Sequence, residues 1–374
     1  MAVLFLQGPM GPFFRKLIHK LREQGTRAYK INFNGGDEWY CRGVDAVSFT
    51  GKEEAWPQFL RDFIINNQVT SVCVFGDCRR YHCAAKAIAQ DMEVGFYAFE
   101  EGYIRPNHIT FERNGVNGYS EIEMQGLLDW QELEIEPENV MGGTLLNRMR
   151  YCFLYYNAVA FRISRFPHYI HHRSLSRCFE MSRWVKALGR YYLYKVTERK
   201  IQKRLVKNHN KQYFLVPLQV YNDAQIHFHS PYDSIEAFIQ QIIGSFAVHS
   251  DEKDILVFKH HPMDRGHCHY GNFIEQQAEA HGVVGRIVYC HDLHLPTLLS
   301  HAKGVITVNS TTALSAFYHK APVKVMGDAF YDIEGLCSQQ SLANFWQAPD
   351  DLNYDLFLRL RNFLSHHGQV NGSF

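Results

Sequence analysis

The sequence predicts an α/β protein with two Rossmann-like domains, and three observations support this prediction. The chain has 374 residues, which is too long for one ordinary hydrophobic core. Its hydrophobic content of 46% is ample for two cores. Short apolar runs alternate with helical patterns in two separate series, which is typical of doubly wound parallel sheets.

The first series begins with an apolar strand at residues 3–6, a turn rich in glycine and proline, and a helical pattern at 13–24. The turn contains Gln7 and Gly8 but has neither a GxGxxG motif nor the GKS or GKT ending of a phosphate-binding loop. It is therefore interpreted as a loop that approaches the ligand cleft closely, or as a plain tight turn. Further strands are predicted at 28–33, 46–49, 71–75 and 94–99, and helices at 53–66 and 79–91.

Glu100, Glu101 and Gly102 follow the predicted strand at 94–99. Side chains alternate along a strand, so only one of the two carboxylates can enter a crevice at its end. Gly102 would let the backbone turn sharply there. A solvated turn is the alternative interpretation. From residue 107 to 118 the chain is predicted to be irregular.

The excess of positive charge is concentrated in residues 148–207, although the formal net charge of the whole chain is only +1. This segment has 15 Lys and Arg against two acidic residues, a balance of +13, so the remaining 24 basic and 36 acidic residues leave −12. Many aromatic side chains lie between the basic ones, as in segments that bind anionic membranes, nucleic acid or an acidic neighbouring domain. Because no nucleic-acid-binding motif accompanies it, we predict a helical segment that faces the membrane, with a solvated basic helix pair as the alternative.

The second series predicts a second α/β domain. Strands are predicted at 213–217, 255–258, 286–289, 304–308 and 323–326, and helices at 234–248, 272–281, 295–302 and 311–319. A last helix at 354–364 could cross back onto the first domain. The predicted parts are an acceptor-side domain at 1–147 joined by 346–374, the basic segment at 148–207, and a donor-binding domain at 208–345. Two facing Rossmann-like domains with a cleft between them form the GT-B architecture, which is known mostly from glycosyltransferases.

The predicted strand at 255–258 ends in Lys259-His260-His261-Pro262. Proline lacks an amide donor and favours an extended backbone in His261, so the strand should stop there with both histidines at its carboxyl end. In open α/β sheets this end faces the ligand crevice. A capped strand end without a ligand is the alternative.

The predicted strand at 304–308 runs into Asn309-Ser310-Thr311-Thr312 and then into a helix. One of the first two residues is a suitable N-cap, and the first amides of a helix lack partners within it. These amides and the neighbouring hydroxyls suit a phosphate, although an unoccupied cap is the alternative. Because both strands would end at the same edge of a parallel sheet, one phosphate could contact this cap and the His-Pro strand end.

In this order and context, the acidic pair before glycine, the His-Pro pair and the Ser-Thr pair resemble three motifs shared by bacterial GT-B sialyltransferases and capsular Kdo transferases. Those enzymes use CMP-activated 2-keto sugar acids. Longer stretches resemble the capsular polysaccharide linker β-Kdo transferases of the KpsS or LipB type. These stretches are residues 99–106, 109–113, 115–118, 217–219, 223–225 and 308–314. The resemblance covers nearly the whole chain and is weakest in the basic segment.

The resemblance implies an inverting glycosyltransferase that transfers β-Kdo from CMP-Kdo to lysophosphatidylglycerol and begins the poly-Kdo linker of a Gram-negative capsular polysaccharide. The expected partners are CMP-Kdo, the lysophosphatidylglycerol acceptor, the anionic inner-membrane surface and other capsule assembly and export proteins, without nucleic acid. The expected location is cytoplasmic, peripheral at the inner face of the inner membrane.

The resemblance also implies direct displacement at the anomeric carbon, with Glu100 as general base and Glu101 as the alternative base. A neighbouring carboxylate and partial burial should raise the pKa of Glu100 towards the working pH. His261 would donate to the departing CMP phosphate, and Ser310 with Thr311 would stabilise the charge that develops there. Donor binding is further assigned to Lys259, Pro262, Asn309 and Thr312, and the wider cleft to Gln7, Gly8, Gly102, Arg105, Gln219, Asp223 and Gln225.

The sequence predicts a transferase without metal or other cofactor. No Asp-x-Asp motif, the usual carboxylate clamp for a metal-bound sugar nucleotide, occurs in the chain. A CMP-sugar has a single phosphate, so less charge needs to be neutralised.

Nine cysteines without a CxxC pair predict reduced thiols in a cytoplasmic protein. The start of the chain is broken too soon by glycine and proline for a signal peptide, and no apolar run reaches the roughly 18 residues needed to span a bilayer.

Two other functions compete with this interpretation. A sialyltransferase that uses CMP-sialic acid would share the nucleotide-side motifs, so only a donor competition assay separates it. A non-catalytic scaffold of the capsule assembly and export complex would use the basic, aromatic segment as its main surface. Such a scaffold needs neither Glu100 nor His261 nor the Ser-Thr cap.

Overall fold

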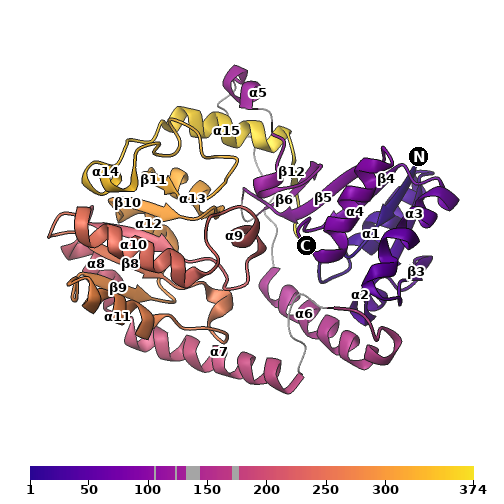
Figure 1. The fold of residues 1–374 in the computed structure, drawn as a ribbon, viewed down its shortest axis with the longest axis horizontal. Helices are drawn as coiled ribbons and strands as arrows, with labels where there is room; N and C mark the ends of the chain where they lie inside the picture. The colour runs from indigo at the N-terminus through magenta and orange to yellow at the C-terminus, as the bar shows by residue number, and fades with distance from the viewer. Residues whose placement is uncertain (105–106, 123, 132–143, 171–176) are drawn as a thin grey trace. The chain divides into compact units, whose positions relative to one another are not determined.

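The computed structural model describes the chain from residue 1 to residue 374 except for residues 105–106, 123, 132–143 and 171–176. The chain divides into two compact units (Figure 1). Unit 1 contains Met1–Trp130, Glu134–Arg177 and Arg361–Phe374, and unit 2 contains Gln131–Leu133 and Cys178–Leu360. Each unit has its own sheet and its own hydrophobic core. The predicted fold class, α/β with two Rossmann-like domains, is therefore confirmed.

Unit 1 is built around a seven-stranded sheet in the order β12-β6-β5-β4-β1-β2-β3. Its strands are β1 (Ala2–Phe5), β2 (Arg27–Asn32), β3 (Ala46–Ser48), β4 (Ser71–Phe75), β5 (Gly95–Glu101), β6 (His108–Arg113) and β12 (Gln369–Asn371). Strands β1 to β5 pair in parallel, β6 pairs antiparallel with β5, and β12 pairs antiparallel with β6. Its helices are α1 (Phe13–Glu23), α2 (Gly35–Tyr40), α3 (Trp56–Asn67), α4 (Arg80–Asp91), α5 (Met124–Asp129) and α6 (Thr144–Phe161), with 3-10 turns at Glu53–Ala55, Asn117–Tyr119 and Ile163–Arg165.

The sheet of unit 1 is covered on both faces, which explains why its strands are continuous apolar runs. In β1, Val3 and Phe5 belong to the cluster that includes residues of α1. Leu4, which points to the opposite face, belongs to the cluster that includes residues of α3. A strand with both faces buried has no reason to alternate apolar and polar residues.

Unit 2 is built around a five-stranded parallel sheet in the order β11-β10-β7-β8-β9. Its strands are β7 (Tyr213–Pro217), β8 (Ile255–Lys259), β9 (Ile287–Cys290), β10 (Gly304–Thr307) and β11 (Val323–Val325). Its helices are α8 (Ile201–Asn208), α9 (Ala224–Phe228), α10 (Ile235–His249), α11 (Gly271–Ala280), α12 (Leu295–His301), α13 (Thr312–Tyr318) and α14 (Leu342–Gln347), with a 3-10 turn at Pro262–Asp264. Helices α7 (Arg177–Thr197) and α15 (Tyr354–His366) cross the boundary between the units.

The prediction of an irregular chain at 107–118 is wrong for its first half, which forms β6. The main chain of β6 pairs with β5, with Thr110 opposite Glu100 and Ile109 opposite Glu101. This pairing explains why β5 extends through both glutamates, past the predicted end of the strand. A pairing between neighbouring strands of opposite direction leaves no helical or turn signal in the sequence.

The basic segment predicted at 148–207 does not form a unit of its own. Helix α6 belongs to unit 1, whereas α8 and nearly all of α7 belong to unit 2. At the end of the chain, α14 belongs to unit 2, and Arg361–Phe374 belongs to unit 1, where β12 pairs with β6. A helix gains most of its stability by packing its apolar face, so each basic helix is a part of the unit on which it packs.

Helix α2 was not predicted, and its two glycines are required by the packing of α6. A Cβ on Gly35 would overlap the carbonyl oxygen of Ala158, and a Cβ on Gly36 would overlap the ring of Tyr155. We expect Gly35→Ala to lower the free energy of unfolding by about 1 to 3 kcal/mol, because the clash is with backbone and cannot be relieved by a rotamer change. Gly189→Ala is the matched control, since nothing lies within 4 Å of that position in α7, and alanine there should be neutral or slightly stabilising. Urea denaturation measures both, and equal stability of the Gly35 variant and wild type would contradict this packing.

Candidate active site

Glu100 lies near the carboxyl end of β5 in unit 1, beside the end of β4. Gly76 follows β4 with φ +71° and donates its amide to the carbonyl of Phe99 at 2.8 Å. A Cβ on Gly76 would lie 3.4 Å from Glu100 Oε2 and 3.6 Å from Arg79 Nε. The glycine therefore borders both the carboxylate and the guanidinium at this strand end.

Burial raises the pKa of Glu100 to about 7 from its usual 4.5. The Glu101 amide, which donates to Glu100 Oε1 at 3.0 Å, and the charge of Arg79 lower the pKa, while the charges of Glu101 and Asp77 raise it. The direction of the shift agrees with the prediction, but burial contributes more than the neighbouring carboxylate. A carboxyl group with a pKa near 7 can accept a proton at neutral pH and suits general-base catalysis.

Glu101 lies on the other face of β5, because successive side chains of a strand alternate. Its carboxylate accepts a hydrogen bond from Arg148 Nη2 of α6 at 3.0 Å. The carboxylate of Glu101 is therefore engaged in an ion pair, whereas burial raises the pKa of Glu100 to about 7. Of the two predicted bases, Glu100 is therefore the better candidate.

Asp77 and His82 adjoin Glu100's strand end and were not singled out by the sequence. Asp77 is buried, and its Oδ2 accepts from the amide of Val116 at 2.9 Å. His82 Nδ1 lies 2.5 Å from the carbonyl oxygen of Gly76, and burial lowers the pKa of His82 to about 3. A Gly-Asp pair directly after a predicted strand is the signal that could have identified this position.

Gln7 and Gly8 follow β1 at the same edge of the sheet. The Gln7 side-chain amide donates to the hydroxyls of Tyr155 at 2.9 Å and Tyr169 at 2.8 Å. A Cβ on Gly8 would lie 2.8 Å from the ring of Phe14. Both residues are thus held by packing inside unit 1, and the amide of Gln7 supports two tyrosines.

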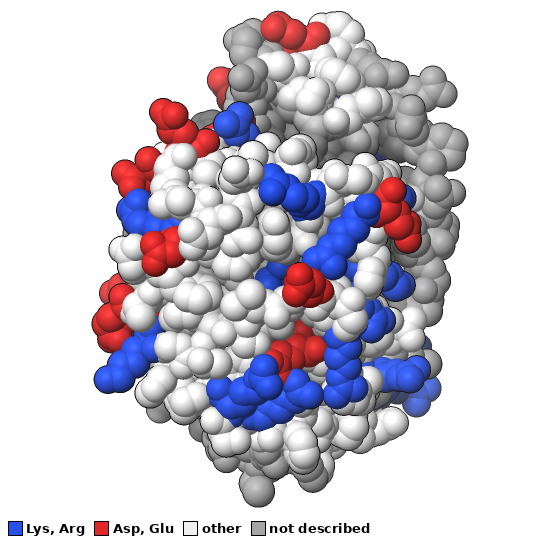
Figure 2. All heavy atoms as spheres, turned by 90° about the vertical axis from the view of Figure 1, so that its right-hand side faces the viewer, with Lys and Arg blue, Asp and Glu red and all other residues white. Residues whose placement is uncertain are grey.

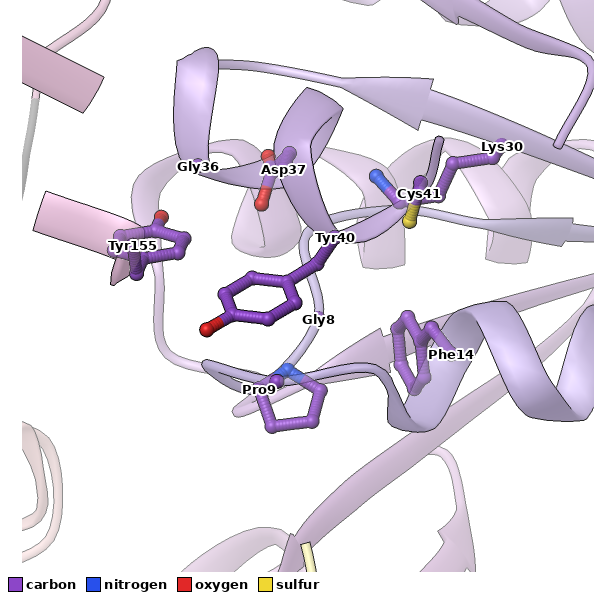
Figure 3. Close-up of a pocket in the computed structure, with 10 residues that line it drawn as sticks. Gly8, Pro9, Phe14, Lys30, Gly36, Asp37, Tyr40, Cys41 and Tyr155 are labelled. Carbon is purple, nitrogen blue, oxygen red and sulfur yellow. The ribbon is translucent and has the colours of Figure 1, made fainter. Parts of the chain in front are cut away.

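A small pocket opens beside this turn (Figure 3). It is lined by Gly8, Pro9, Gly11, Phe14, Lys30, Gly36, Asp37, Tyr40, Cys41 and Tyr155. Burial raises the pKa of Asp37, and the charge of Lys30 opposes this shift. The pocket has room for roughly one water molecule, so it is too small for a sugar.

His260 and His261 follow β8 in unit 2 and have different surroundings. His260 is buried with the Tyr289 hydroxyl 2.7 Å from its Nδ1, and burial lowers its pKa to about 3. His261 is partly exposed and caps the turn at Pro262–Asp264, where its Nδ1 accepts from the Met263 amide at 3.2 Å. A neutral imidazole that accepts at Nδ1 has its proton on Nε2, so His261 can donate a hydrogen bond from Nε2.

Lys259, which was predicted to bind the donor, contacts the segment after β9. Its side chain is buried, its Nζ donates to the carbonyl of His291 at 3.2 Å, and burial lowers its pKa. The buried carboxylate of Glu198 accepts from the His291 amide at 3.0 Å, from His291 Nδ1 at 2.6 Å and from the Asp292 amide at 3.2 Å. Lys259 and Glu198 therefore both hold the segment that follows β9.

Gln219, Asp223 and Gln225, which were predicted near the cleft, gather around Asn309. The side-chain amide of Gln219 donates to Asn309 Oδ1 at 2.9 Å and to Asp223 Oδ2 at 3.2 Å. Asn309 Nδ2 donates to the Gln225 carbonyl at 3.0 Å, and Asp223 Oδ1 accepts from the Gln225 amide at 3.0 Å. These bonds fix the segment after β10 against the loop after β7.

The loop after β7 also contacts the segment after β8. The amide of Tyr221 donates to Asp264 Oδ2 at 2.7 Å. Because β7 lies between β8 and β10 in the sheet, this loop connects the His261 segment with the Ser310 segment. The predicted donor-binding segments therefore belong to one hydrogen-bonded edge of unit 2.

Ser310, Thr311 and Thr312 form the turn between β10 and α13. Ser310 Oγ accepts from the Thr312 amide at 3.2 Å and donates to Thr312 Oγ1 at 3.0 Å. The amides of Ala313 and Leu314 donate to the carbonyls of Ser310 and Thr311 at 3.0 and 3.1 Å. These three amides already have partners, which corrects the prediction of an unpartnered helix N-terminus. A phosphate at this turn would meet mainly the hydroxyl groups.

Two further predicted cleft residues give different outcomes. Arg105 lies outside the described residues. Gly102 is buried, and a Cβ there would overlap the carbonyl oxygen of His108 in β6. Gly102 therefore allows β6 to approach closely where the chain leaves β5 and reverses its direction.

No group of three or more His, Cys, Asp or Glu side chains among the described residues could hold a metal ion. Within the same residues, no helix has both the length and the hydropathy needed to cross a bilayer. The metal-free mechanism remains a prediction.

Comparison with known proteins places this chain among capsule proteins. It is 41% identical over 372 residues to the capsule polysaccharide export protein KpsS of Escherichia coli, covering 98% of this chain and 95% of that protein. It is 37% identical over 383 residues to the capsule polysaccharide modification protein LipB of Neisseria meningitidis serogroup A, covering 100% of this chain and 91% of that protein. The solved structure of Thermosulfurimonas dismutans KpsC, a beta Kdo 2,7 transferase, matches with a TM-score of 0.45 and 15% identity, covering 96% of this chain and 89% of that chain.

The family assignment rests on two independent findings. Residues 70–374 match the family described as capsule polysaccharide biosynthesis protein. The two curated relatives match over nearly their full length and exceed 30% identity. The resemblance inferred from the motifs is thereby confirmed. The chain belongs to the capsule polysaccharide biosynthesis protein family.

Proposed function

We propose that this protein is a glycosyltransferase that transfers Kdo from CMP-Kdo to lysophosphatidylglycerol and begins the poly-Kdo linker of a capsular polysaccharide. Family membership supports a role in capsule synthesis. The observation that carries the enzymatic proposal is Glu100, a carboxyl group with a pKa of about 7 near the carboxyl end of a strand. An acceptor hydroxyl needs such a base, whereas a scaffold protein does not.

In the proposed reaction, Glu100 takes the proton of the acceptor hydroxyl while the hydroxyl oxygen attacks the anomeric carbon of Kdo. The bond from this carbon to the phosphate oxygen breaks, and CMP leaves with its electron pair. A single displacement of this kind inverts the configuration at the anomeric carbon. The anomeric configurations of donor and product test this step, because retention of configuration would contradict a single displacement.

Two groups of unit 2 are proposed to stabilise the departing CMP. His261 can donate from Nε2 to a phosphate oxygen, because its Nδ1 is held by the amide of Met263. The hydroxyls at Ser310 and Thr311 would add hydrogen bonds to the charge that develops on the phosphate. The hydrogen-bonded loop after β7 supports this proposal, since it connects both segments.

His261→Ala and Ser310→Ala should each weaken CMP binding by about 10- to 100-fold. Loss of a hydrogen bond to a charged group costs about 1.5 to 3 kcal/mol, which corresponds to this range. Isothermal titration with CMP measures the effect without any transfer. His281→Ala, at an exposed position of the same unit, should bind CMP as wild type does. Unchanged affinity in both site variants would place the phosphate elsewhere.

We further propose that transfer needs no metal, because a CMP-sugar has only one phosphate to neutralise. The purified protein should release CMP from CMP-Kdo when lysophosphatidylglycerol is present, and should do so in EDTA. Activity that disappears in EDTA and returns with magnesium would contradict the metal-free mechanism. Absence of acceptor-dependent CMP release with and without metal would favour the scaffold interpretation.

The lipid acceptor implies that the protein works at a membrane surface, and the surface of the chain supports this. Ten of the 22 large apolar side chains that are exposed among the described residues lie between Met149 and Val196, within the basic segment. On the face drawn in Figure 2, Lys and Arg side chains are interspersed with Asp and Glu. Exposed apolar and basic side chains in one segment are what an anionic lipid surface binds. We therefore propose a peripheral location at the cytoplasmic face of the inner membrane.

A further inference from the structure

The inward face of α7 is held firmly by unit 2. The ring of Tyr194 stacks on His291 with 3.7 Å between centroids and an interplanar angle of 7°. Arg190 Nη1 donates to the carbonyl of Arg265 at 2.7 Å, and Glu198 directly after the helix accepts from the segment after β9. In Figure 1, α7 runs beside β9 and α11 along unit 2. Because these contacts fix the helix about its own axis, they also fix which side chains point outward.

The outward face of α7 is apolar. Val185, Leu188, Tyr192 and Val196 are 71%, 58%, 62% and 75% exposed, and Leu193 beside them is 55% exposed. At about 100° per residue, the first four lie within an arc of roughly 80°. An amphipathic helix of a globular protein normally turns such an arc towards the core, but here the core side is occupied by other residues of the same helix.

The apolar arc has basic residues on both sides. Lys186 and Lys195 are exposed and lie about 100° from Val185 on one side and about 80° on the other. Residues 183–207 contain nine Lys and Arg and one acid, and that acid is the buried Glu198. The face therefore offers apolar area and positive charge together.

We propose that the outward face of α7 binds an anionic phospholipid surface, with its apolar side chains between the lipid headgroups and its lysines at the phosphates. Lysine stems can lie along the apolar arc while their ammonium groups reach the phosphates on both sides. Arg190 is excluded from this surface because its guanidinium belongs to the inward face. The proposal deepens the proposed function, whose acceptor is a lipid, by naming the face that docks.

Vesicle sedimentation tests the proposal without donor or acceptor. The membrane-binding proposal can therefore fail while the proposed Kdo transfer holds, and Kdo transfer can fail while membrane binding holds. The full chain is mixed with phosphatidylglycerol vesicles or with phosphatidylcholine vesicles. Wild type should bind the anionic vesicles, and the double variant Leu188→Asp with Val196→Asp should bind them at least about tenfold more weakly at low and at high salt, because an apolar contact is lost. Lys186→Gln with Lys195→Gln should weaken binding at low salt and have little effect at high salt, where the charges are screened.

The control is a double variant with equally exposed apolar residues outside α7. Val248 and Val284 of unit 2 are 74% and 66% exposed, and Val248→Asp with Val284→Asp should bind vesicles as wild type does. Far-UV circular dichroism melting checks that each variant is folded, and Leu188→Ser with Val196→Ser replaces the aspartate pair if that pair is not. Equal binding of the α7 variant and wild type would overturn the proposal, as would equal loss in the control. Equal binding to both kinds of vesicle would overturn the anionic specificity.

Discussion

Glu100→Gln is expected to lower kcat of Kdo transfer about 100-fold or more, with CMP binding unchanged. Glutamine keeps the shape and one acceptor oxygen of the side chain but cannot take the proton of the acceptor hydroxyl. Steady-state CMP release measures kcat, and titration with CMP measures binding. Glu101→Gln removes the ion pair with Arg148 and should change kcat only slightly. If Glu100→Gln is active and Glu101→Gln is inactive, Glu101 is the general base and the assignment of Glu100 is wrong.

The pH dependence gives a second test of the same assignment. A base must be deprotonated, so kcat/KM of wild type should rise with pH through about 7 and level off above it. Burial also raises the pKa of Glu112 to about 7, so this rise should persist in Glu112→Gln and be absent in Glu100→Gln. A rise that persists in the Glu100 variant would belong to another group.

Thermal stability shows whether Glu100→Gln loses activity because the base is missing or because the variant unfolds. Because the pKa of Glu100 is higher in the folded protein than its usual 4.5, the fold favours the protonated form. This contribution to stability is complete below about pH 4.5 and is lost as the pH rises through about 7. Glutamine is never charged, so Glu100→Gln should melt at the same temperature as wild type or higher at pH 8. A lower melting temperature would assign the activity loss to unfolding.

Glu198→Ala is expected to destabilise unit 2 by about 3 to 5 kcal/mol. The change leaves two buried N–H groups of His291 and the partly buried amide of Asp292 without their carboxylate acceptor. Urea denaturation monitored by circular dichroism measures the loss. Glu252→Ala, at an exposed position of the same unit, should stay within about 0.5 kcal/mol of wild type. Equal stability of Glu198→Ala and Glu252→Ala would show that this carboxylate does not hold the segment after β9.

Much of the sheet architecture could be predicted because the central strands are buried on both faces. For this reason β8 is a continuous apolar run in the sequence. Pro262 begins the 3-10 turn after β8, where the chain leaves the sheet. β6 and the extension of β5 could not be predicted, because they depend on each other through main-chain pairing. Main-chain pairing of this kind is only weakly encoded in local side-chain patterns.

The candidate site could be predicted in its residue types and only partly in its geometry. His261 was placed correctly at a strand end, but which of its nitrogens carries the proton depends on the Met263 amide. Lys259 was assigned to the donor, yet its long side chain reaches the carbonyl of His291 across the neighbouring strand. The role of Glu198 could not be predicted, because its partner His291 is 93 residues away and leaves no local sequence pattern.

The central claim is that the protein transfers Kdo from a CMP-sugar, and a donor competition assay tests it most directly. The purified chain is incubated in EDTA with lysophosphatidylglycerol and equal amounts of CMP-Kdo and CMP-sialic acid, and the lipid products are identified by mass spectrometry. We expect one Kdo to be added to the acceptor by wild type, with Glu100→Gln forming about 100-fold less product. A sialylated lipid as the main product, or no glycosylated lipid at all, would contradict the account.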